Sequence, residues 1–276
     1  MVGGLVGEVQ SELTHHFGPW INTRQYSTPV YTVGAHQPTV RVRLDRDLPD
    51  LQEAISSVPI PPGAKPAAGT DRQMVVWQPA TDTMWEFWKM REQAGKWYAE
   101  AAGAMHDVST NPGYFSRAAW PGAQPWWGAT ATGLPLLGGL MTIRELKRGR
   151  IDHALAMAIP DSRRGVWSRP ATHSDGNTAR RNALPEGARL RLDPALDLDR
   201  LNLPPVTQVI ATAAQRYGIV VRDRAGVVAF YAQDPTPTGS NPYPGIFRNR
   251  YPDELLASFP WRRLQVLKLQ VRGPGR

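Results

Sequence analysis

Short stretches in which apolar and polar residues alternate dominate the chain and predict β-strands. Residues 38–44 (PTVRVRL) place three aliphatic side chains on one face and polar side chains on the other. Residues 73–78 (QMVVWQ) and 83–90 (TMWEFWKM) flank the turn-forming PATD and predict a β-hairpin. A third strand over residues 96–105 follows the loop REQAG. Together these segments predict a β-meander in the middle of the chain.

Two segments carry helix signals instead. Residues 142–149 (TIRELKRG) begin with Thr142 and Glu145 at the spacing of a capping box and end on a glycine suited to a helix C-terminus. Residues 205–217 place apolar side chains on one face, with a proline at the start and a glycine after the end. Further strands are expected over residues 151–159, 188–192, 219–222 and 227–233.

Many strands with two or three short helices in their connections favour a mainly-β fold, an antiparallel β-sandwich. A parallel βαβ fold would need regular alternation of helices and strands, which the meander over residues 73–105 contradicts. Residues 1–25 lack sustained periodicity and are interpreted as an N-terminal arm. Residues 26–276 then form a single sandwich domain, near the size limit of one hydrophobic core.

Composition supports a folded core and narrows the chemistry. Ten tryptophans fit either a thick sandwich core or platforms that stack on sugars, because an indole joins a broad apolar face to one N–H donor. The absence of cysteine excludes disulfides, thiolate catalysis and cysteine-based zinc sites. The net charge of +8 favours an anionic surface as partner. The basic residues are dispersed and no nucleic-acid motif accompanies them, so specific nucleic-acid recognition is not expected.

The N-terminal segment gives no sign of export. MVGGLVGEVQSELTHHFG lacks a charged region followed by an apolar one, so no signal peptide is expected. No stretch reaches the apolar length of a transmembrane segment. We therefore expect synthesis in the cytoplasm, with action outside the cell only if something other than the secretion machinery carries the chain there.

Glu86 is the first candidate catalytic residue. On the expected strand it shares a face with Met84 and Trp88. These neighbours would remove water from the carboxylate, raise its pKa and suit it to work as a general acid. The alternative is a carboxylate that pairs with an arginine or binds a ligand hydroxyl, and the periodicity leaves both open.

His153 and Asp152 are the second candidates. On the expected strand 151–159, His153 shares a face with aliphatic residues, and Asp152 lies opposite with three alanines. A histidine on an apolar face is commonly a core residue, and the alternative is a general base at a cleft. Glu86 or Asp152 acting with His153 would be the catalytic set of a polysaccharide hydrolase or lyase.

Other chemical motifs are weak. The string THSDG (172–176) holds a histidine, a serine and an aspartate, but their adjacency favours a turn over a catalytic triad. His15 and His16 point in different directions, and no H-x-x-x-H or EF-hand spacing occurs. The string GLPLLGG matches neither a P-loop nor a dinucleotide fingerprint. No metal site and no cofactor are expected.

The aromatic loop over residues 109–128 (STNPGYFSRAAWPGAQPWWG) is the strongest binding candidate. Its length suggests function or disorder, and its aromatic content argues against disorder. Exposed tryptophans would stack on sugar faces, and nearby polar side chains would bond sugar hydroxyls. The alternative is a loop that folds over its own core, with the tryptophans packed into that core. The candidate glycan-binding residues are Trp120, Trp126, Trp127, Asn111 and Arg117.

Five longer strings carry a family resemblance: WINTRQYSTPVYTV (20–33), WQPATDTMWEFWKM (77–90), WGATATGLPLLGGLMTIRELKRGRIDHALAMAIP (127–160), ALPEGARLRLDP (183–194) and AAQRYGIVVRD (213–223). Within residues 20–265 they resemble minor tail proteins of actinobacterial phages, which have similar domains in secreted actinobacterial proteins. The resemblance implies a virion component near the tail tip that is released by lysis. Its implied partners are other phage tail proteins and a host envelope rich in mycolic acid or arabinogalactan.

The implied architecture is similar to the jelly-roll sandwich of concanavalin A-like lectins and glucanases. The E-x-D-x-x-E strand of laminarinase-like hydrolases is absent, as are the Q-[IV]-H and Y-x-K-x-G-x-Y patterns of alginate-lyase-like sandwiches. We predict a tail-tip protein that contacts host cell-wall polysaccharide. Two alternatives stay open: an enzyme that degrades that polysaccharide, and a structural tail subunit that docks through its arm and basic C-terminus. Self-association as a homo-oligomer stays open too.

Overall fold

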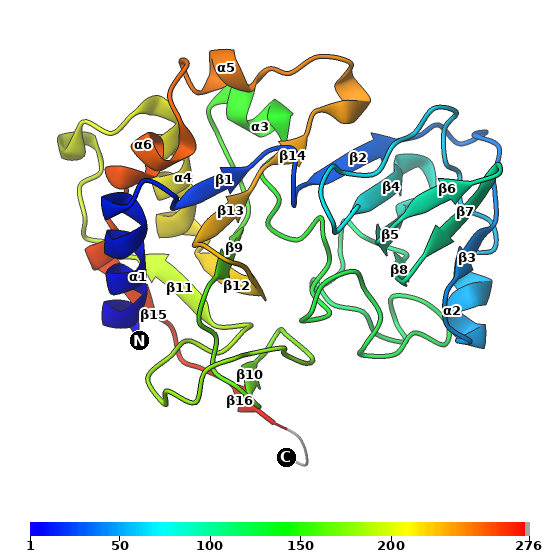
Figure 1. The fold of residues 1–276 in the computed structure, drawn as a ribbon, viewed down its shortest axis with the longest axis horizontal. Coiled ribbons are helices and arrows are strands. Elements are labelled where there is room, and N and C mark those ends of the chain that lie inside the picture. Colours follow the sequence, from blue (N-terminus) through cyan, green and yellow to red (C-terminus); the bar gives the residue numbers. More distant parts are fainter. Residues whose placement is uncertain (274–276) are drawn as a thin grey trace. The chain divides into compact units, whose positions relative to one another are not determined.

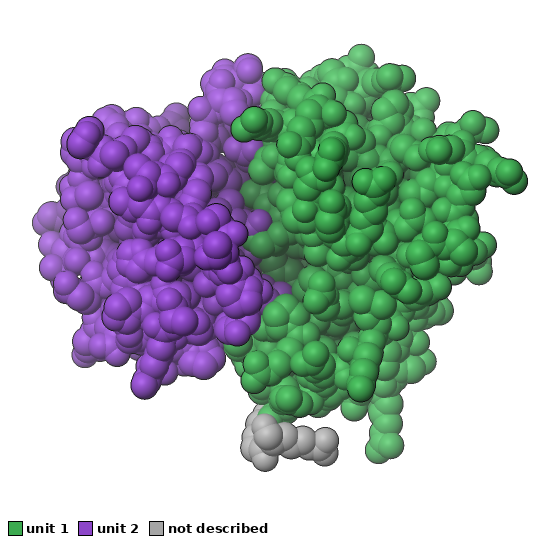
Figure 2. Space-filling model, turned by 180° about the vertical axis from the view of Figure 1, so that it is seen from behind, with its two compact units in different colours: residues 1–22, 138–232, 241–276 green, residues 23–137, 233–240 purple. Residues whose placement is uncertain are grey.

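The computed structural model describes residues 1–273, which form 16 strands and six α-helices (Figure 1). The chain divides into two compact units, coloured separately in Figure 2. Unit 1 comprises residues 1–22, 138–232 and the chain from Asn241 on, and unit 2 comprises residues 23–137 and 233–240. This division differs from the expected arm over residues 1–25 followed by one sandwich domain over residues 26–276, of which residues 274–276 lie outside the described chain.

A six-stranded sheet forms the centre of unit 1, in the order β1-β13-β9-β12-β11-β15. Its strands are β1 (Trp20–Asn22), β9 (Leu155–Ile159), β11 (Arg189–Leu192), β12 (Ile219–Arg224), β13 (Ala229–Tyr231) and β15 (Leu264–Val266). β9 pairs parallel with β12 and antiparallel with β13. All five residues of β9 are buried, as expected for a strand covered on both faces. A separate antiparallel pair joins β10 (Trp167–Ser168) to β16 (Val271–Arg272).

The helices of unit 1 confirm two sequence signals. α3 (Ile143–Arg148) starts with a capping box between Thr142 and Glu145 and ends at Gly149, whose φ of 71° favours glycine. α4 (Pro205–Arg216) buries one apolar face in the core of the unit. The remaining helices are α1 (Val2–Thr14), α5 (Tyr243–Ile246) and α6 (Pro252–Ala257), with 3-10 turns at Asp199–Leu201 and Trp261–Arg263. Among residues 1–273, no helix has the length and hydropathy needed to cross a membrane.

Unit 2 contains a five-stranded sheet, β14-β2-β4-β5-β8, and a three-stranded sheet, β3-β7-β6. The elements are β2 (Thr28–Thr32), β3 (Val42–Leu44), α2 (Pro49–Ala54), β4 (Met74–Gln78), β5 (Thr83–Trp88), β6 (Arg91–Gln93), β7 (Lys96–Ala99), β8 (Ala101–Met105) and β14 (Gln233–Asp234), with 3-10 turns at Pro79–Thr81 and Thr236–Thr238. The predicted hairpin is confirmed as β4 and β5, and β8 extends it antiparallel. The strand expected over residues 96–105 is instead divided at Glu100 into β7 and β8, which enter different sheets.

Both units are built on β-sheets with helices in their connections, but the antiparallel jelly roll is not confirmed because both larger sheets are mixed. In unit 2, β2 pairs parallel with β4 and β14. In unit 1, β1 pairs parallel with β13, and β9 with β12. Parallel neighbours need a long crossover, and residues 33–73 and 160–218 supply two of them. These pairs join strands distant in sequence, so local alternation carried no information about their direction.

The residues expected to form an arm carry α1 and β1, and both elements belong to unit 1. Leu5, Val9 and Glu12 lie three or four residues apart and form the buried face of α1. The backbone N–H of Val228 donates to Oε1 of Glu12 at 2.7 Å. Oε2 of the same carboxylate is buried and has no hydrogen-bond partner within the described chain. α1 is therefore part of the core of unit 1.

Burial changes the ionisation of Glu12. Loss of water raises the pKa of Glu12 from 4.5 to about 7, because it outweighs the opposing hydrogen bond from Val228, and the nearby charge of Glu8 adds to the rise. The folded chain therefore binds this proton more tightly than the unfolded chain does. The resulting stabilisation is complete below the unfolded pKa and is lost as the pH rises through about 7.

We expect Glu12→Gln to reduce the pH dependence of stability. Glutamine resembles the protonated carboxyl group and does not ionise, so the fall in free energy of unfolding between about pH 5 and pH 8 should shrink by roughly 3 kcal/mol. Urea unfolding across this pH range measures the effect. The exposed Glu92→Gln serves as the control. An unchanged pH slope in Glu12→Gln would show that the proton is bound elsewhere.

Candidate functional site

Buried rings hold the aromatic loop over residues 109–128 to unit 2. Trp127 and Phe115 are fully buried. The half-buried indole of Trp120 stacks on the imidazole of His106, with ring centroids 3.9 Å apart and ring planes at 10°. For Trp120 and Trp127, these contacts support the alternative in which the tryptophans pack the loop against the core of its own domain.

Trp126 differs from its neighbours because its side chain is 47% exposed. It directly precedes Trp127, so a buried anchor holds an exposed indole in place. Arg117 of the same loop is exposed as well. The side-chain oxygen of Asn111 accepts backbone N–H groups from the two residues after Pro112, and this turn shapes the loop. Of the five predicted glycan-binding residues, Trp126 and Arg117 are those with exposed side chains.

A groove within unit 2 offers a second surface for a polar ligand. Its volume is about 670 Å³, within the usual range of small-molecule sites. The hydroxyl group of Tyr31 accepts the backbone N–H of Lys65 and donates to the carbonyl of the same residue, which fixes one wall. Three prolines add rigid apolar surface. The polar side chains of the lining are Tyr31, Thr32, Lys65, Gln233, Thr236 and Thr238.

Glu86 lies in β5 with no exposed surface. Its Oε1 accepts the backbone N–H of Ala129 at 2.8 Å, and its Oε2 accepts that of Leu136 at 2.7 Å. The carboxylate therefore fastens the segment that follows the aromatic loop to the five-stranded sheet. This geometry favours a structural role over proton transfer to a substrate, because both oxygens bind the backbone and none reaches solvent.

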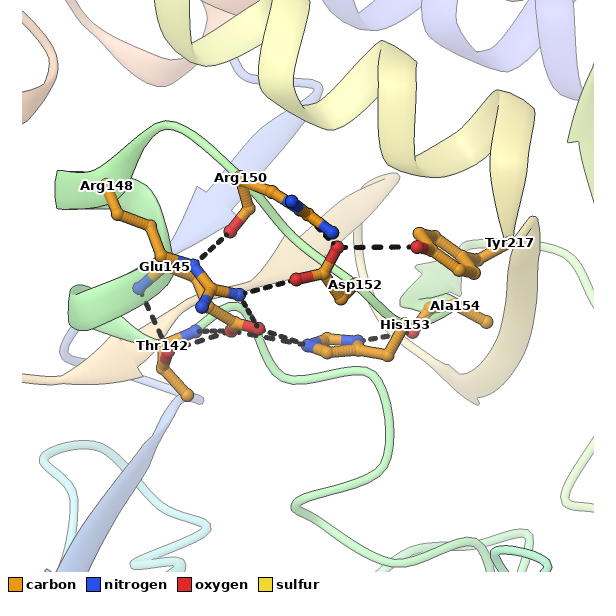
Figure 3. A network of polar contacts seen from close by, with 8 residues as sticks. All are labelled: Thr142, Glu145, Arg148, Arg150, Asp152, His153, Ala154 and Tyr217. Carbon is orange, nitrogen blue, oxygen red and sulfur yellow. Dashed lines mark hydrogen bonds and ion pairs between the residues drawn. The ribbon is translucent and has the colours of Figure 1, made fainter.

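Asp152 lies in a network of ion pairs in unit 1 (Figure 3). Its Oδ1 accepts from Nε of Arg150 at 2.6 Å and from the hydroxyl of Tyr217 at 3.3 Å, and its Oδ2 accepts from Arg148 at 2.9 Å. The hydrogen bond from Arg150 is the largest cause of a pKa of Asp152 below its usual range. An ionised, salt-bridged carboxylate of this kind is not a general acid.

His153 belongs to the same network and precedes β9 instead of lying within it. Its Nε2 lies 3.2 Å from Oε1 of Glu145, and its Nδ1 lies 2.9 Å from the carbonyl oxygen of Ala154. Both ring nitrogens face acceptors, which favours the doubly protonated ring. Burial opposes the charge on His153, yet the hydrogen bonds to Glu145 and Ala154 prevail and raise the pKa of His153. The network therefore joins α3, the turn before β9 and the end of α4.

Sequence reasoning missed one further cluster, in which Asp175, Glu186 and Asp223 each place a carboxylate oxygen within 4.8 Å of the others. All three belong to unit 1. Burial raises the pKa of Glu186 to about 8, with Ser174 opposing the rise and the two aspartates adding to it. Three oxygen ligands of this type suit a hard cation such as Ca²⁺ or Mg²⁺. Asp175 belongs to THSDG, but no local spacing linked it to the other two residues.

We expect His153 to titrate with a pKa above its ordinary value of 6.5 in an NMR experiment. Glu145→Gln should lower that pKa, because glutamine keeps the capping box but removes the negative charge beside the ring. The stabilisation tied to His153 is present below its unfolded pKa and is lost as the pH rises through the higher folded pKa. The exposed Glu53→Gln should leave the titration unchanged. A His153 pKa that does not respond to Glu145→Gln would contradict the ion pair.

We expect Glu86→Ala to destabilise unit 2 by about 2–5 kcal/mol, because two buried backbone N–H groups lose their acceptor. Urea unfolding measures the loss. Amide hydrogen exchange at Ala129 and Leu136 should accelerate before global unfolding. Glu92→Ala, in the exposed part of β6, is the matched control and should change stability little. Unaltered exchange at both amides would refute the fastening role.

Comparison with known proteins finds no match: no protein-family model, no curated protein and no solved structure matches the chain. The resemblance carried by the five sequence strings therefore stays an expectation from the sequence. The function of the chain has to be inferred from its exposed surfaces and from the partners of its polar side chains.

Proposed function

We propose that this chain is a minor tail protein of an actinobacterial phage that contacts glycan of the host cell envelope. The exposed indole of Trp126, held by the buried Trp127, carries the proposal. An indole open to solvent stacks on the apolar face of a sugar ring. Arg117 of the same loop supplies N–H donors for hydroxyl or acidic groups. The resemblance to phage tail proteins supports the virion as location and the host envelope as partner.

The partners of the candidate catalytic residues favour binding over cleavage. Glycosidases use two carboxyl groups about 5–10 Å apart, one of which must hold a proton to donate. Glu86 is buried and binds two backbone N–H groups in unit 2. Asp152 is salt-bridged to two arginines and His153 is paired with Glu145, both in unit 1. We therefore propose a role without hydrolysis.

The proposal of a purely structural tail subunit has less support. It assigned docking to an arm over residues 1–25 and to the basic C-terminus, yet the first of these segments contains α1, whose buried face packs in the core of unit 1. The groove of unit 2, by contrast, adds a polar surface of a size that accepts a sugar. Contacts with other tail proteins remain part of the proposal, without an assigned segment.

We expect Trp126→Ala to weaken binding of the full chain to purified arabinogalactan about tenfold, because loss of one stacking contact removes roughly 1–1.5 kcal/mol. Calorimetry or a pull-down with host cell wall measures the change. Tyr251→Ala is the matched control, since it removes an aromatic side chain that is 69% exposed in unit 1.

Other results of the glycan-binding experiment would contradict parts of the proposal. Equal binding by the wild-type chain and Trp126→Ala would move the contact away from the aromatic loop. No binding to any host glycan would overturn the proposed function. Release of reducing ends or unsaturated products from the polymer, lost in His153→Ala, would establish the enzyme instead.

A further inference from the structure

Three segments of unit 1 bring one carboxylate each to a common point. Asp175 lies in the turn over residues 172–176, Glu186 lies shortly before β11, and Asp223 lies in β12. Glu186 is fully buried, Asp223 is half-buried and Asp175 is exposed. Ions from solvent can therefore reach the cluster at Asp175, whereas the carboxylate of Glu186 is shielded from solvent.

The protein satisfies one oxygen of the buried Glu186 carboxylate and leaves the other without a donor. Oε2 accepts the backbone N–H of Asp175 at 3.1 Å. Oε1 is buried and has no hydrogen-bond partner within residues 1–273. A buried polar atom of this kind is unfavourable unless a ligand or proton occupies its lone pairs. The carboxylate that carries this unpartnered oxygen is one of the three that meet in the cluster.

The backbone holds the carboxylates in position. The residue after Glu186, Gly187, has a φ of +77°, and a Cβ there would lie 1.7 Å from the carbonyl oxygen of Ser168. The N–H of Ser168 in turn donates to the carbonyl oxygen of Glu186 at 2.7 Å. Asp223 lies where the register between β12 and β9 shifts, and such bulges redirect side chains. The cluster thus follows from backbone packing and a β-bulge, and not from mobile side chains.

The negative charge of the cluster is partly compensated by Arg224. Its Nη2 lies 3.6 Å from Oδ2 of Asp175, longer than a charge-assisted hydrogen bond. At that separation the guanidinium offsets only part of the charge of Asp175. Like charges held this close favour either a bound proton or a bound cation.

We propose that Asp175, Glu186 and Asp223 bind a hard divalent cation, with Ca²⁺ as the best match. Ca²⁺ takes oxygen ligands at about 2.3–2.6 Å, so two ligands on opposite sides of one ion lie about 4.6–5.2 Å apart. The carboxylate oxygens, all within 4.8 Å of one another, are close enough to bind one such ion. Mg²⁺ demands near-ideal octahedral geometry at about 2.0–2.1 Å and gives up its water reluctantly, whereas Ca²⁺ accepts the irregular geometry of carboxylates from three separate segments. The ion would fasten the segment between β9 and β11 to β12, and this role is independent of glycan binding.

Titration of the chelator-treated full chain with CaCl₂ tests the site. Calorimetry should show one saturable event with a Kd of about 10⁻⁵–10⁻³ M, and the thermal midpoint should rise with Ca²⁺ concentration. Tb³⁺, which replaces Ca²⁺ at oxygen sites, should luminesce on excitation of Trp167, whose backbone pairs with Glu186. Trp167→Phe should reduce this emission and leave the Ca²⁺ affinity unchanged.

Three variants decide the assignment. Glu186→Gln and Asp175→Asn should each weaken Ca²⁺ binding at least about tenfold, whereas Asp197→Asn, an exposed acid in the same unit, should not. Asp175 is exposed, so its variant keeps the test valid even if Glu186→Gln folds poorly. The proposal is overturned if the wild-type chain gives no saturable heat with Ca²⁺, Mg²⁺ or Mn²⁺ up to about 10 mM. It is also overturned if Asp175→Asn and Asp197→Asn bind Ca²⁺ equally well.

Discussion

Unit 1 depends on the complete burial of one strand, β9. Its five apolar residues have both faces covered, and its two edges are paired with β12 and β13. Because both edges are occupied, β9 determines where segments from distant parts of the chain must lie. The residues just before it carry Asp152 and His153. The bulge in β12 beside it carries Asp223. The two polar clusters of unit 1 are thus built on the same central strand.

Three fully or almost fully buried glutamates show different solutions to one physical problem. A buried carboxylate must be hydrogen-bonded, protonated or paired with a cation. Glu86 accepts two backbone N–H groups and fastens a loop. Glu12 accepts one N–H and shifts its pKa toward neutrality. Glu186 accepts one N–H and faces two further carboxylates. An oxygen without a donor separates Glu12 and Glu186 from Glu86, and the two neighbouring carboxylates make Glu186 the candidate ligand.

The two units offer different chemistry. Unit 2 presents an exposed indole on an anchored loop and a polar groove, both of which suit a neutral or acidic sugar. Unit 1 carries the salt-bridge network and the carboxylate cluster, both of which connect helices and loops to its sheet. The proposed glycan contact thus belongs to unit 2, whereas the polar clusters of unit 1 cross-link its elements electrostatically.

Short-range signals in the sequence determined the local elements. The capping box of Thr142 and Glu145, the proline that begins α4 and the hairpin of β4 and β5 each depend on residues a few positions apart, so the chain alone specified them. The tertiary structure decided strand direction, because parallel partners such as β9 and β12 lie some 60 residues apart. It also decided that Trp127 is buried while Trp126 is exposed, and that Asp175, Glu186 and Asp223 meet. Burial and long-range proximity arise from packing between distant segments, which no local pattern encodes.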